Sequence, residues 1–359
     1  MKVAVICKTF MKGGAEKQAL ILTRLLADKN ISVCLVNWEG RKVDRVNLDF
    51  IEKNSIRYYG LRGSILNKLF QFQRILRNEK ISIIVSYLTM SNFLSGISKL
   101  FNRNIKCIGG IRNEKLPYAK FVLEKLIHNY LSDATVFNNY SGRMKFEKRG
   151  FDPAKAHVIQ NAIDQDGPAS LSKSPNGEIN IVTVGRFVKQ KDYATALHSF
   201  KILSERNRDK KFKYNIIGYG PLEKEIRFLA GKLKIDSKIR LFINPPNVYE
   251  ILKKSDIFLS TSLFEGVSNS IMEAMVNGLP VVATDVGDNS YLIKDGQNGY
   301  LVPCRDPAGI AEKLERLSES PERRKEFGRN SQSVIENDFT QSKLLDNYMR
   351  LFSALQAVH

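Results

Sequence analysis

The sequence of 359 residues contains only four cysteines, and none of them forms a Cys-x-x-Cys pair or a Cys/His cluster. This scatter argues against a structural zinc site and is typical of a reducing compartment. The apolar run at the N-terminus ends at Lys8 and is too short for the core of a signal peptide. No segment approaches the ~20 apolar residues that a membrane-spanning helix needs. We therefore expect a cytoplasmic protein.

Two phosphate-binding motifs are also missing. The chain has no Gly-x-x-x-x-Gly-Lys-Ser/Thr loop, which disfavours kinase-like phosphoryl transfer. Gly13 and Gly14 precede the first expected helix, but their spacing is not that of the Gly-x-Gly-x-x-Gly dinucleotide fingerprint. The two glycines still permit a close backbone approach and leave free amides at the start of that helix.

Acidic residues are scarce in the first part of the chain. Residues 1–150 hold 27 Lys and Arg against 11 Asp and Glu, whereas residues 151–359 hold 29 against 26. A local positive field suits an anionic membrane surface, phosphorylated substrates or a nucleic acid. The basic residues are not interleaved with aromatics in a recognisable nucleic-acid module, so we do not expect nucleic acid as a partner. A basic composition that serves only solubility is the alternative.

What the chain does contain is an alternation of strand and helix patterns, which predicts α/β domains with parallel, doubly wound sheets. The alternation restarts after a polar, turn-rich stretch, so we expect two Rossmann-like domains facing a cleft. The expected segments are an N-terminal domain at 1–165, a linker at 166–178, a C-terminal domain at 179–336 and a final helix at 337–359 that packs back toward the N-terminal domain. The expected strands are residues 2–7, 33–36, 81–85, 106–110 and 134–137, then 179–184, 213–217, 239–242, 256–260, 280–284 and 299–302.

Two glutamates follow the expected strand at 256–260. Glu265 sits on a glycine-containing turn at the carboxyl end of that strand, where open α/β sheets place their ligands. Glu273 lies one turn inside the next helix, whose first amides, near Asn269, Ser270 and Ile271, can hold an anion. A phosphate there would lie between two carboxylates that can accept hydrogen bonds from hydroxyl groups. A sugar nucleotide has its parts in the same order: sugar hydroxyls, diphosphate, ribose hydroxyls. The alternative is a solvated loop glutamate and a second glutamate favoured by the helix dipole.

Cationic side chains follow the first expected strand of the second domain. Arg186 and Lys191 can converge above the sheet and offset the charge on a departing nucleoside diphosphate without a metal ion. The alternative is a pair of solvated basic residues on a loop. Gly218 follows the next strand and either shapes the floor for a nucleobase or simply forms a turn.

With these residues assembled, the chain resembles the GT-B glycosyltransferases of family 4, the retaining group that uses nucleoside-diphosphate sugars. The resemblance spans nearly the whole chain and is strongest from about residue 158 to 305. It rests on the order and spacing of several motifs, including Glu265 and Glu273 with seven residues between them. The other motifs are Gly13-Gly14-Ala15-Glu16, residues 158–164, Val184-Gly185-Arg186 with Lys191, residues 280–287 and residues 295–302.

The resemblance implies a role for each candidate residue. Arg186, Lys191 and the first amides of the helix after Glu265 would bind the donor diphosphate, and Gly14 would approach the phosphate or the acceptor from the other domain. Glu265 would hold donor-sugar hydroxyls beneath the anomeric carbon, and Glu273 would hold the ribose. Relatives generally need no divalent metal and no cofactor besides the donor. The acceptor hydroxyl would enter on the face where the diphosphate leaves, and a diphosphate oxygen would take its proton.

One departure from the family concerns a histidine that many relatives carry in an N-domain loop near the donor sugar. None of His128, His157, His198 and His359 lies in a suitable loop. After the strand at 106–110 we expect Arg112 or Asn113 to occupy that place, which leaves the choice of sugar open. The nucleobase is also open, with uracil as the default.

Two basic amphipathic segments, residues 61–80 and 116–131, can lie on anionic lipid, although their apolar faces can equally pack on the sheet. The resemblance and the charge asymmetry together predict a peripheral membrane hexosyltransferase that uses a UDP-sugar and a saccharide or lipid-linked saccharide acceptor for surface polysaccharide. The alternatives are a sugar-nucleotide epimerase of similar shape and, more remotely, a non-catalytic nucleic-acid-binding protein.

Overall fold

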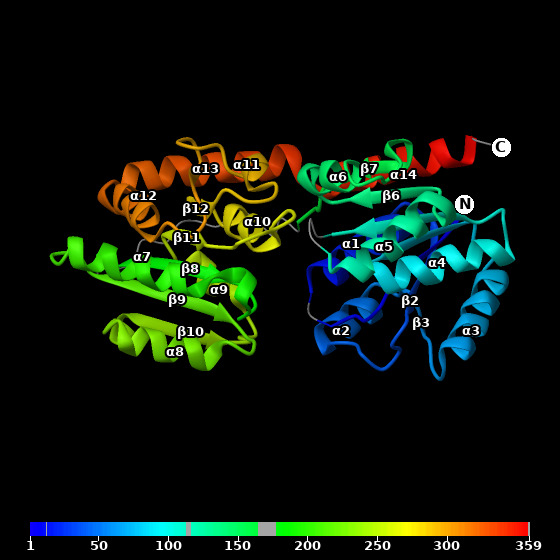
Figure 1. Cartoon of the computed structure of the whole chain (residues 1–359), viewed down its shortest axis with the longest axis horizontal. Helices are drawn as coiled ribbons and strands as arrows, with labels where there is room; N and C mark the ends of the chain where they lie inside the picture. Colours follow the sequence, from blue (N-terminus) through cyan, green and yellow to red (C-terminus); the bar gives the residue numbers. More distant parts are fainter. Residues whose placement is uncertain (12, 113–115, 164–176, 358–359) are drawn as a thin grey trace. The chain divides into compact units, whose positions relative to one another are not determined.

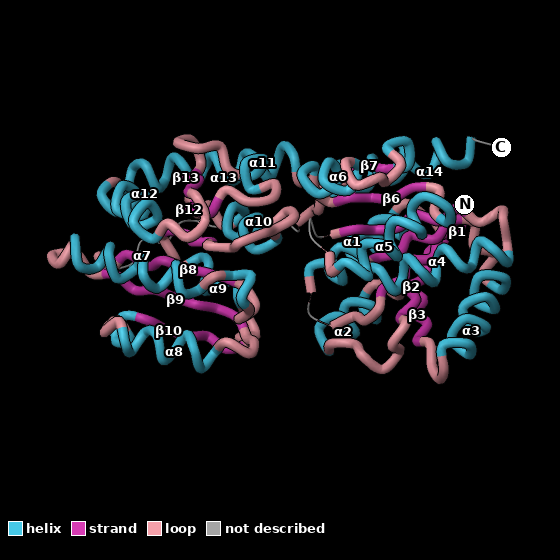
Figure 2. Tube along the Cα trace, viewed as in Figure 1, coloured by secondary structure: helices cyan, strands magenta, loops and turns pink. Residues whose placement is uncertain are grey.

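The computed structural model describes residues 1–11, 13–112, 116–163 and 177–357, and the chain divides into two compact units. Unit 1 comprises Met1–Ala162 and Phe339–His359, and unit 2 comprises Ile163–Asp338. Most of the expected linker at 166–178 lies outside the described residues. Figure 2 shows that helices cover both faces of the sheet in each unit.

Unit 1 is built on a parallel sheet of seven strands in the order β3-β2-β1-β4-β5-β6-β7. Its strands are β1 (Lys2–Cys7), β2 (Ser32–Asn37), β3 (Arg57–Gly60), β4 (Ile83–Tyr87), β5 (Lys106–Ile111), β6 (Ala134–Phe137) and β7 (Ala156–Val158). Its helices are α1 (Gly14–Asp28), α2 (Arg45–Lys53), α3 (Ile65–Asn78), α4 (Thr89–Phe101), α5 (Tyr118–Leu126), the π-helix η1 (Ile127–Leu131), α6 (Tyr140–Glu147), the 3₁₀ turn η2 (Pro153–Lys155) and α14 (Gln341–Ala357).

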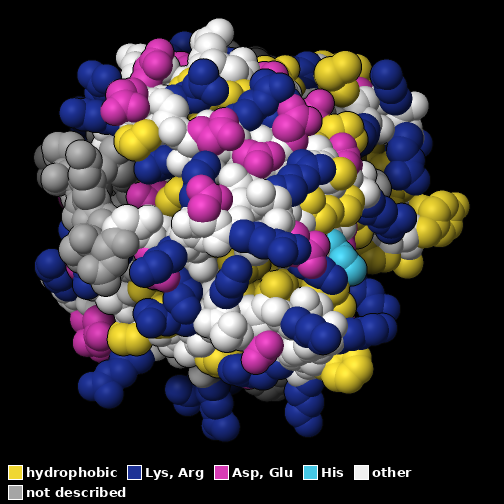
Figure 3. Space-filling model, turned by 90° about the vertical axis from the view of Figure 1, so that its left-hand side faces the viewer, with side chains coloured by type: hydrophobic (Ala, Val, Ile, Leu, Met, Phe, Trp, Pro, Cys, Tyr) yellow, Lys and Arg dark blue, Asp and Glu magenta, His cyan; other side chains and the backbone are white. Residues whose placement is uncertain are grey.

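Unit 2 repeats this architecture with six parallel strands in the order β10-β9-β8-β11-β12-β13. Its strands are β8 (Ile179–Val184), β9 (Phe212–Gly218), β10 (Ile239–Ile243), β11 (Ile257–Ser260), β12 (Val281–Thr284) and β13 (Gly299–Val302). Its helices are α7 (Tyr193–Arg206), α8 (Glu223–Lys232), α9 (Val248–Lys253), α10 (Asn269–Val276), α11 (Asn289–Leu292), α12 (Pro307–Glu319) and α13 (Pro321–Asp338), with 3₁₀ turns η3 (Lys189–Lys191) and η4 (Asp236–Lys238). On the face in Figure 3, seen from the side of Figure 1 where unit 2 lies, basic and acidic side chains are interspersed.

The strand sequences explain why both sheets are covered on two faces. Along β1, Val3, Val5 and Cys7 join one buried cluster, whereas Ala4 and Ile6 join another on the opposite face. Successive side chains of a strand point to opposite faces, so a nearly continuous apolar run marks a strand buried on both sides. The strand order reverses between β1 and β4 in unit 1 and between β8 and β11 in unit 2. These reversals are the positions where doubly wound sheets bind ligands.

The helix at the end of the chain belongs to the core of unit 1 (Figure 1). Its buried residues pack in one cluster with α1 and with the strands β1 and β4. Those residues are Leu344, Leu345, Tyr348, Leu351 and Phe352. The Arg24 guanidinium of α1 also donates a hydrogen bond to the Gln341 side chain at the start of α14.

The structure differs from the sequence-based expectation at three places. The strands β3 and β7 are not predicted from the sequence, because β3 is a half-exposed edge strand of four residues and β7 has only three. The helix expected at 337–359 begins later, at Gln341, because α13 runs to Asp338 and Thr340 accepts from the Lys343 amide at the start of α14. The segment expected as one helix at 116–131 changes from α5 to a π-helix at Ile127.

A buried carboxyl group lies between α5 and the sheet of unit 1. Glu124 is 2% exposed and accepts hydrogen bonds from Asn92 Nδ2 at 3.0 Å to both carboxyl oxygens. Asn92 in turn bonds the Gly110 amide at 3.0 Å and so supports the carboxyl end of β5. Burial raises the pKa of Glu124 to about 7, against the opposing effect of the hydrogen bonds from Asn92 and Thr89.

We expect Glu124 to make unit 1 less stable as the pH rises. A carboxyl whose pKa is higher in the folded state than in the unfolded state holds its proton more tightly when folded. Its stabilising contribution is therefore complete near pH 4.5 and falls as the pH rises toward 7. The loss amounts to up to about 3 kcal/mol. Urea unfolding of wild type and Glu124→Gln at pH 5 and pH 8 measures it, and parallel changes in the two proteins would contradict it.

Candidate functional site

The candidate site of unit 2 lies where the order of its strands reverses. The strands β8 and β11 are neighbours in register, with Ile181 opposite Ile257 and Val182 opposite Phe258. The loop after β8 carries Arg186 and Lys191, and the loop after β11 carries Glu265. Because both strands are parallel, their carboxyl ends bring these two loops to one edge of the sheet.

Lys191 and Glu265 form an ion pair at this edge. Lys191 Nζ lies 2.5 Å from Glu265 Oε1, and the two side chains are only 16% and 11% exposed. Ser262 Oγ donates to the same carboxylate oxygen at 2.8 Å. One carboxylate oxygen of Glu265 thus accepts two hydrogen bonds, which fixes the orientation of the group.

Further hydrogen bonds hold the two loops against each other. Gln190 Nε2 donates to the Phe264 carbonyl at 2.7 Å, and the Leu263 amide donates to the Gln190 carbonyl at 2.8 Å. Thr261 Oγ1 donates to the Lys191 carbonyl at 2.9 Å. These hydrogen bonds hold the two loops together without using the Lys191 or Glu265 side chains, so the loops position the ion pair.

Glycines allow neighbouring loops to approach this frame closely. A side chain on Gly218, at the end of β9, would place its Cβ 1.9 Å from the Gly185 carbonyl oxygen. Gly287, in the loop after β12, has a φ of +58°, and a Cβ there would lie 2.3 Å from the Glu265 carbonyl oxygen. The turn that carries Glu265 is thus packed directly against the backbone of the β12–α11 loop.

We expect Gly287→Ala to destabilise unit 2 by about 2–4 kcal/mol, because it combines a positive φ with a backbone clash that no side-chain movement relieves. The matched control is Gly296→Ala. Gly296 also has a positive φ, +73°, but nothing lies within 4 Å of its added Cβ. The control should cost only about 1 kcal/mol in urea unfolding. Equal losses in the two variants would show that the contact with Glu265 is not tight.

The helix α10 begins four residues after Glu265. Ser268 precedes its first turn and makes no side-chain cap to it, and Asn269 and Ser270 are half-buried. Ile271 is fully buried, so only its amide could serve a ligand, whereas Glu273 is half-buried one turn into the helix. The first amides of α10 therefore open beside the Lys191–Glu265 pair and suit an anion.

Arg186 is placed differently from Lys191. It lies on the same loop, directly after Gly185, but its side chain is exposed and takes part in none of the ion pairs between described residues. The structure thus brings Lys191 and Glu265 together and leaves Arg186 at the rim. A cation, a carboxylate and helix-end amides side by side can bind an anionic group next to hydroxyl groups.

Unit 1 has a corresponding edge at the reversal between β1 and β4. Gly14 is the first residue of α1 and is exposed, and Gly13 precedes it without a side-chain cap. Arg112 follows β5 and is buried, while Asn113 lies outside the described residues. The histidines lie elsewhere: His128 is buried in η1, His157 lies in β7 and His198 lies in α7, with His359 outside the described residues.

Several residues of these edges were not expected from the sequence. In unit 2 they are Ser262 and Gln190, which orient Glu265 and its loop. Ser262 could have been found as a polar residue close after a buried strand. The Gln190 side chain donates to a carbonyl 74 positions away, and no local sequence pattern indicates such a contact. In unit 1, Tyr87 and Tyr348 contact Arg112, and Tyr348 lies 236 positions after it in the sequence.

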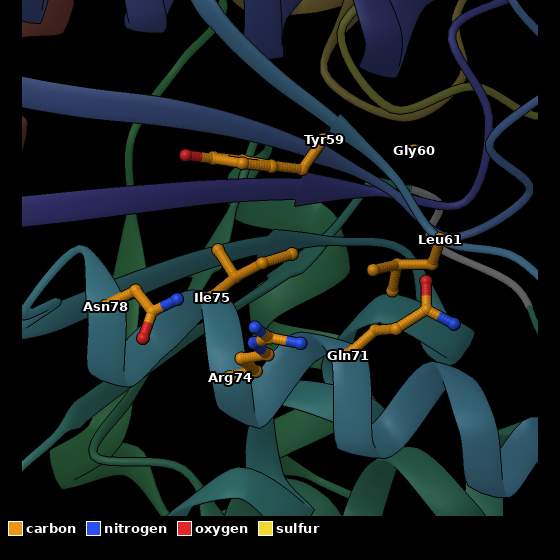
Figure 4. Close-up of a pocket in the computed structure, with 7 residues that line it drawn as sticks. All are labelled: Tyr59, Gly60, Leu61, Gln71, Arg74, Ile75 and Asn78. Carbon is orange, nitrogen blue, oxygen red and sulfur yellow. The ribbon is translucent and has the colours of Figure 1, made fainter.

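A cavity of about 370 Å³ lies apart from these edges, between the end of β3 and α3. Figure 4 shows Tyr59 lying over Ile75, with Leu61 and Gln71 together at one end and Arg74 and Asn78 on the helix. Across the described residues, no three His, Cys, Asp or Glu side chains gather as a metal cluster would require. No helix in the described part of the chain combines the length and the apolar character needed to cross a membrane.

The sequence matches two family models that together cover most of the chain. Residues 12–166 match the model described as Glycosyltransferase Family 4, and residues 170–334 match the model described as Glycosyl transferases group 1. All the candidate residues described above fall within these two ranges.

Individual relatives and solved structures match over nearly the full length. The N-acetylgalactosamine-N,N'-diacetylbacillosaminyl-diphospho-undecaprenol 4-alpha-N-acetylgalactosaminyltransferase of Campylobacter jejuni is 24% identical, over 91% of this chain and 92% of its own. The GalNAc-alpha-(1->4)-GalNAc-alpha-(1->3)-diNAcBac-PP-undecaprenol alpha-1,4-N-acetyl-D-galactosaminyltransferase of the same organism is 22% identical over 99% of both chains. The structure of Anabaena Alr3699/HepE in complex with UDP-glucose superposes with a TM-score of 0.86 at 15% identity, covering 99% of this chain and 100% of that one.

Proposed function

Because the chain belongs to the family 4 glycosyltransferases of the GT-B fold, we propose that it moves a sugar from a nucleoside-diphosphate sugar to a lipid-linked saccharide, with retention of anomeric configuration. UDP is the proposed nucleotide, and no divalent metal or other cofactor takes part in the proposal. The product belongs to the biosynthesis of a surface polysaccharide.

The observation that carries this proposal is the Lys191–Glu265 pair beside the start of α10, at the strand reversal of unit 2. Lys191, Arg186 and the first amides of α10 suit the donor diphosphate, and Glu265 suits the hydroxyls of the donor sugar. Glu273, within α10, suits the ribose. Asn269 and Ser270 then line the diphosphate, and Gly218 lies toward the base.

In the proposed reaction the bond between the anomeric carbon and the diphosphate oxygen breaks while the acceptor hydroxyl attacks on the same face. A diphosphate oxygen takes the hydroxyl proton. Negative charge grows on the leaving diphosphate, where Lys191 and the helix amides stabilise it. Positive charge grows at the anomeric carbon, where the Glu265 carboxylate opposes it. The protein supplies position and charge and forms no bond to the sugar.

The relatives support the choice of substrates. The names of both Campylobacter relatives specify undecaprenol diphosphate carriers as acceptors, and several GT-B structures of this shape contain UDP or UDP-glucose. These names favour a lipid diphosphate-linked acceptor and a UDP-sugar for this chain.

A donor screen tests the proposal. Each nucleotide sugar of a panel is added to the full chain, and the shift in melting temperature is measured with and without EDTA. A UDP-sugar should raise the melting temperature in both conditions, and product analysis with a lipid-linked saccharide should give one new α-linkage if the donor is an α-sugar. Conversion of the nucleotide sugar into its epimer without acceptor would support the epimerase instead. An inverted linkage would contradict retention.

We also propose that unit 1 docks on an anionic membrane surface from the cytoplasmic side. The helix α3 exposes Ile65, Leu66 and Phe70, whose exposed fractions are 60%, 67% and 73%. Arg74, which lines the cavity beside α3, lies one turn after Phe70 (Figure 4). Residues 1–150 carry the large excess of Lys and Arg over Asp and Glu. Exposed apolar side chains next to cations suit the interface of an anionic bilayer.

Flotation with vesicles that contain phosphatidylglycerol checks this docking. Phe70→Ser should weaken vesicle binding about tenfold, because one aromatic side chain no longer enters the interface. The matched control is Phe228→Ser on α8 of unit 2, where the phenyl group is 74% exposed. The control should bind vesicles like the wild type. Binding that does not depend on anionic lipid, or equal losses in both variants, would refute docking through α3.

A further inference from the structure

We infer that Arg112 of unit 1 binds an oxyanion of the substrate, either a phosphate or a carboxylate. This inference rests on the proposed function, which supplies the substrate. It goes further by proposing that unit 1 recognises a negatively charged group of that substrate. It depends on the surroundings of one buried guanidinium, on its spare hydrogen-bonding capacity and on its place in the sheet.

Among the described residues, the groups that contact the Arg112 guanidinium are neutral. The residue is 9% exposed, and its guanidinium carbon lies 4.6 Å from the centre of the Tyr87 ring. Nη1 donates to Asn161 Oδ1 at 2.9 Å, and Nη2 lies 3.5 Å from the Tyr348 hydroxyl, at the limit of a hydrogen bond. Among the described residues, no carboxylate forms an ion pair with Arg112. The guanidinium is therefore a buried charge with no ion-pair partner among the described residues.

The guanidinium also keeps unused donors. It carries five N–H groups, of which Asn161 and Tyr348 accept two. Nε is buried and has no hydrogen-bond partner. Burial of a charge without an opposite charge is unfavourable, and an amide acceptor and an aromatic face offset only part of this cost. A planar fork with spare donors matches the two oxygens of a carboxylate or a phosphate.

The position of Arg112 is that of a ligand site. The ring beneath it, Tyr87, ends β4 and stands in register with Cys7 at the end of β1, so the guanidinium lies over the reversal of strand order. The helix α1 begins beside this edge, because the Gln18 side chain bonds the backbone of Ala162, next to Asn161. The first turn of α1 has no side-chain cap, but it carries the Glu16 carboxylate beside Gly13, which offsets the positive end of the helix.

Anchoring of α14 does not by itself account for this charge. The contact with Tyr348 is long, and α14 is held to unit 1 by four other buried apolar residues and by the bond between Arg24 and Gln341. A neutral hydrogen-bond donor could bond Asn161 and Tyr348 without burying a cation, and only the cation–π contact with Tyr87 would be lost. The charge is explained if an anion arrives with the substrate and replaces the missing counter-ion.

Binding of small anions to the full-length chain tests the inference. The protein carries Lys191→Gln so that phosphate binding in unit 2 is weakened, and the probes are inorganic pyrophosphate, glucuronate and glucose. Calorimetry should show binding of pyrophosphate or glucuronate and none of glucose. Arg112→Gln should weaken the binding of the anion about tenfold or more. If pyrophosphate binds more tightly than glucuronate, the group that Arg112 recognises is the phosphate of a lipid-linked acceptor. If glucuronate binds more tightly, it is the carboxylate of an acidic sugar.

A second variant keeps Arg112 and supplies the counter-ion from the protein. Asn161→Asp places a carboxylate at the position of the amide that now accepts from Nη1. It should raise the melting temperature and weaken anion binding about tenfold, because the internal carboxylate competes with the ligand. A purely structural Arg112 would give the same thermal gain with unchanged anion binding. Tyr348→Phe removes only the long contact and should keep the affinity within about threefold.

Anion binding of equal strength in the parent, Arg112→Gln and Asn161→Asp proteins, or no anion binding in the parent, would overturn the inference. Neither assay uses a nucleotide-sugar donor or measures sugar transfer. The anion-binding result can therefore be interpreted even if the proposed function is wrong. If the protein transfers sugar but Arg112→Gln does not change its affinity for anions, the proposed function stands and the inference about Arg112 is wrong.

Discussion

Replacement of Glu265 by glutamine should lower kcat for sugar transfer by about 10²- to 10³-fold. In the proposed reaction, positive charge develops at the anomeric carbon and the Glu265 carboxylate opposes it, whereas a neutral amide would provide much less of that stabilisation. The fold should survive, because the side-chain oxygen of glutamine can still accept from Ser262 and Lys191, which now donate to Glu265 Oε1 at 2.8 and 2.5 Å. Initial rates with saturating donor and acceptor measure the effect.

The control for this variant is Glu312→Gln in the same unit. Glu312 is 47% exposed, and its ion pairs within the described residues are with Arg316 at 2.7 Å and Lys313 at 3.5 Å. Its replacement should leave kcat unchanged, since exposed ion pairs contribute little. A Glu265→Gln enzyme that keeps its secondary structure and turns over within about twofold of wild type would place the reacting centre elsewhere.

Replacement of Lys191 by methionine should lower kcat/KM for the donor by about 10²- to 10³-fold, because in the proposed reaction this cation stabilises the leaving diphosphate. The variant should also unfold at lower temperature. Glu265 would remain 11% exposed without its ion-pair partner, and an unpaired, largely buried carboxylate is destabilising. Lys191→Arg should recover part of the activity because it restores the charge, although with a different shape. Donor-saturation kinetics and a melting curve separate the two effects.

The matched control is Lys189→Met, two positions earlier on the same 3₁₀ turn η3. The Lys189 side chain is exposed and forms no ion pair with the described residues. Its loss should change the activity less than about twofold, because a solvated charge at this distance is screened. Similar losses in Lys189→Met and Lys191→Met would show that only the general positive field matters.

The sequence predicts the layers of the fold well where strands are buried on both faces. The expected strands at 179–184 and 299–302 agree with β8 and β13 to the residue, because apolar runs bounded by turn formers leave little freedom. Glu265 and Glu273 could be placed on a loop and a helix for the same reason. The edge strand β3 was not predicted, since Arg57 and two half-exposed tyrosines do not form an apolar run.

The pairings within the sites could not be predicted. Lys191 and Glu265 are 74 positions apart, and their contact depends on β11 lying next to β8 rather than next to β10. That choice is made by the packing of whole helices and strands, so no local pattern records it. The neighbours of Arg112 are similar: the Tyr348 hydroxyl comes from a helix 236 positions later.

The discontinuity of unit 1 has a consequence for the newly made chain. Domains usually fold in the order in which the ribosome releases them. Here the first half emerges with the cluster around β1 and α1 still missing the five buried side chains of α14, which are synthesised only after the whole of unit 2. Unit 2 is continuous from Ile163 to Asp338 and can complete its core earlier. The half that leaves the ribosome first is therefore the half that matures last, and until then it exposes a strip of apolar surface that chaperones can bind.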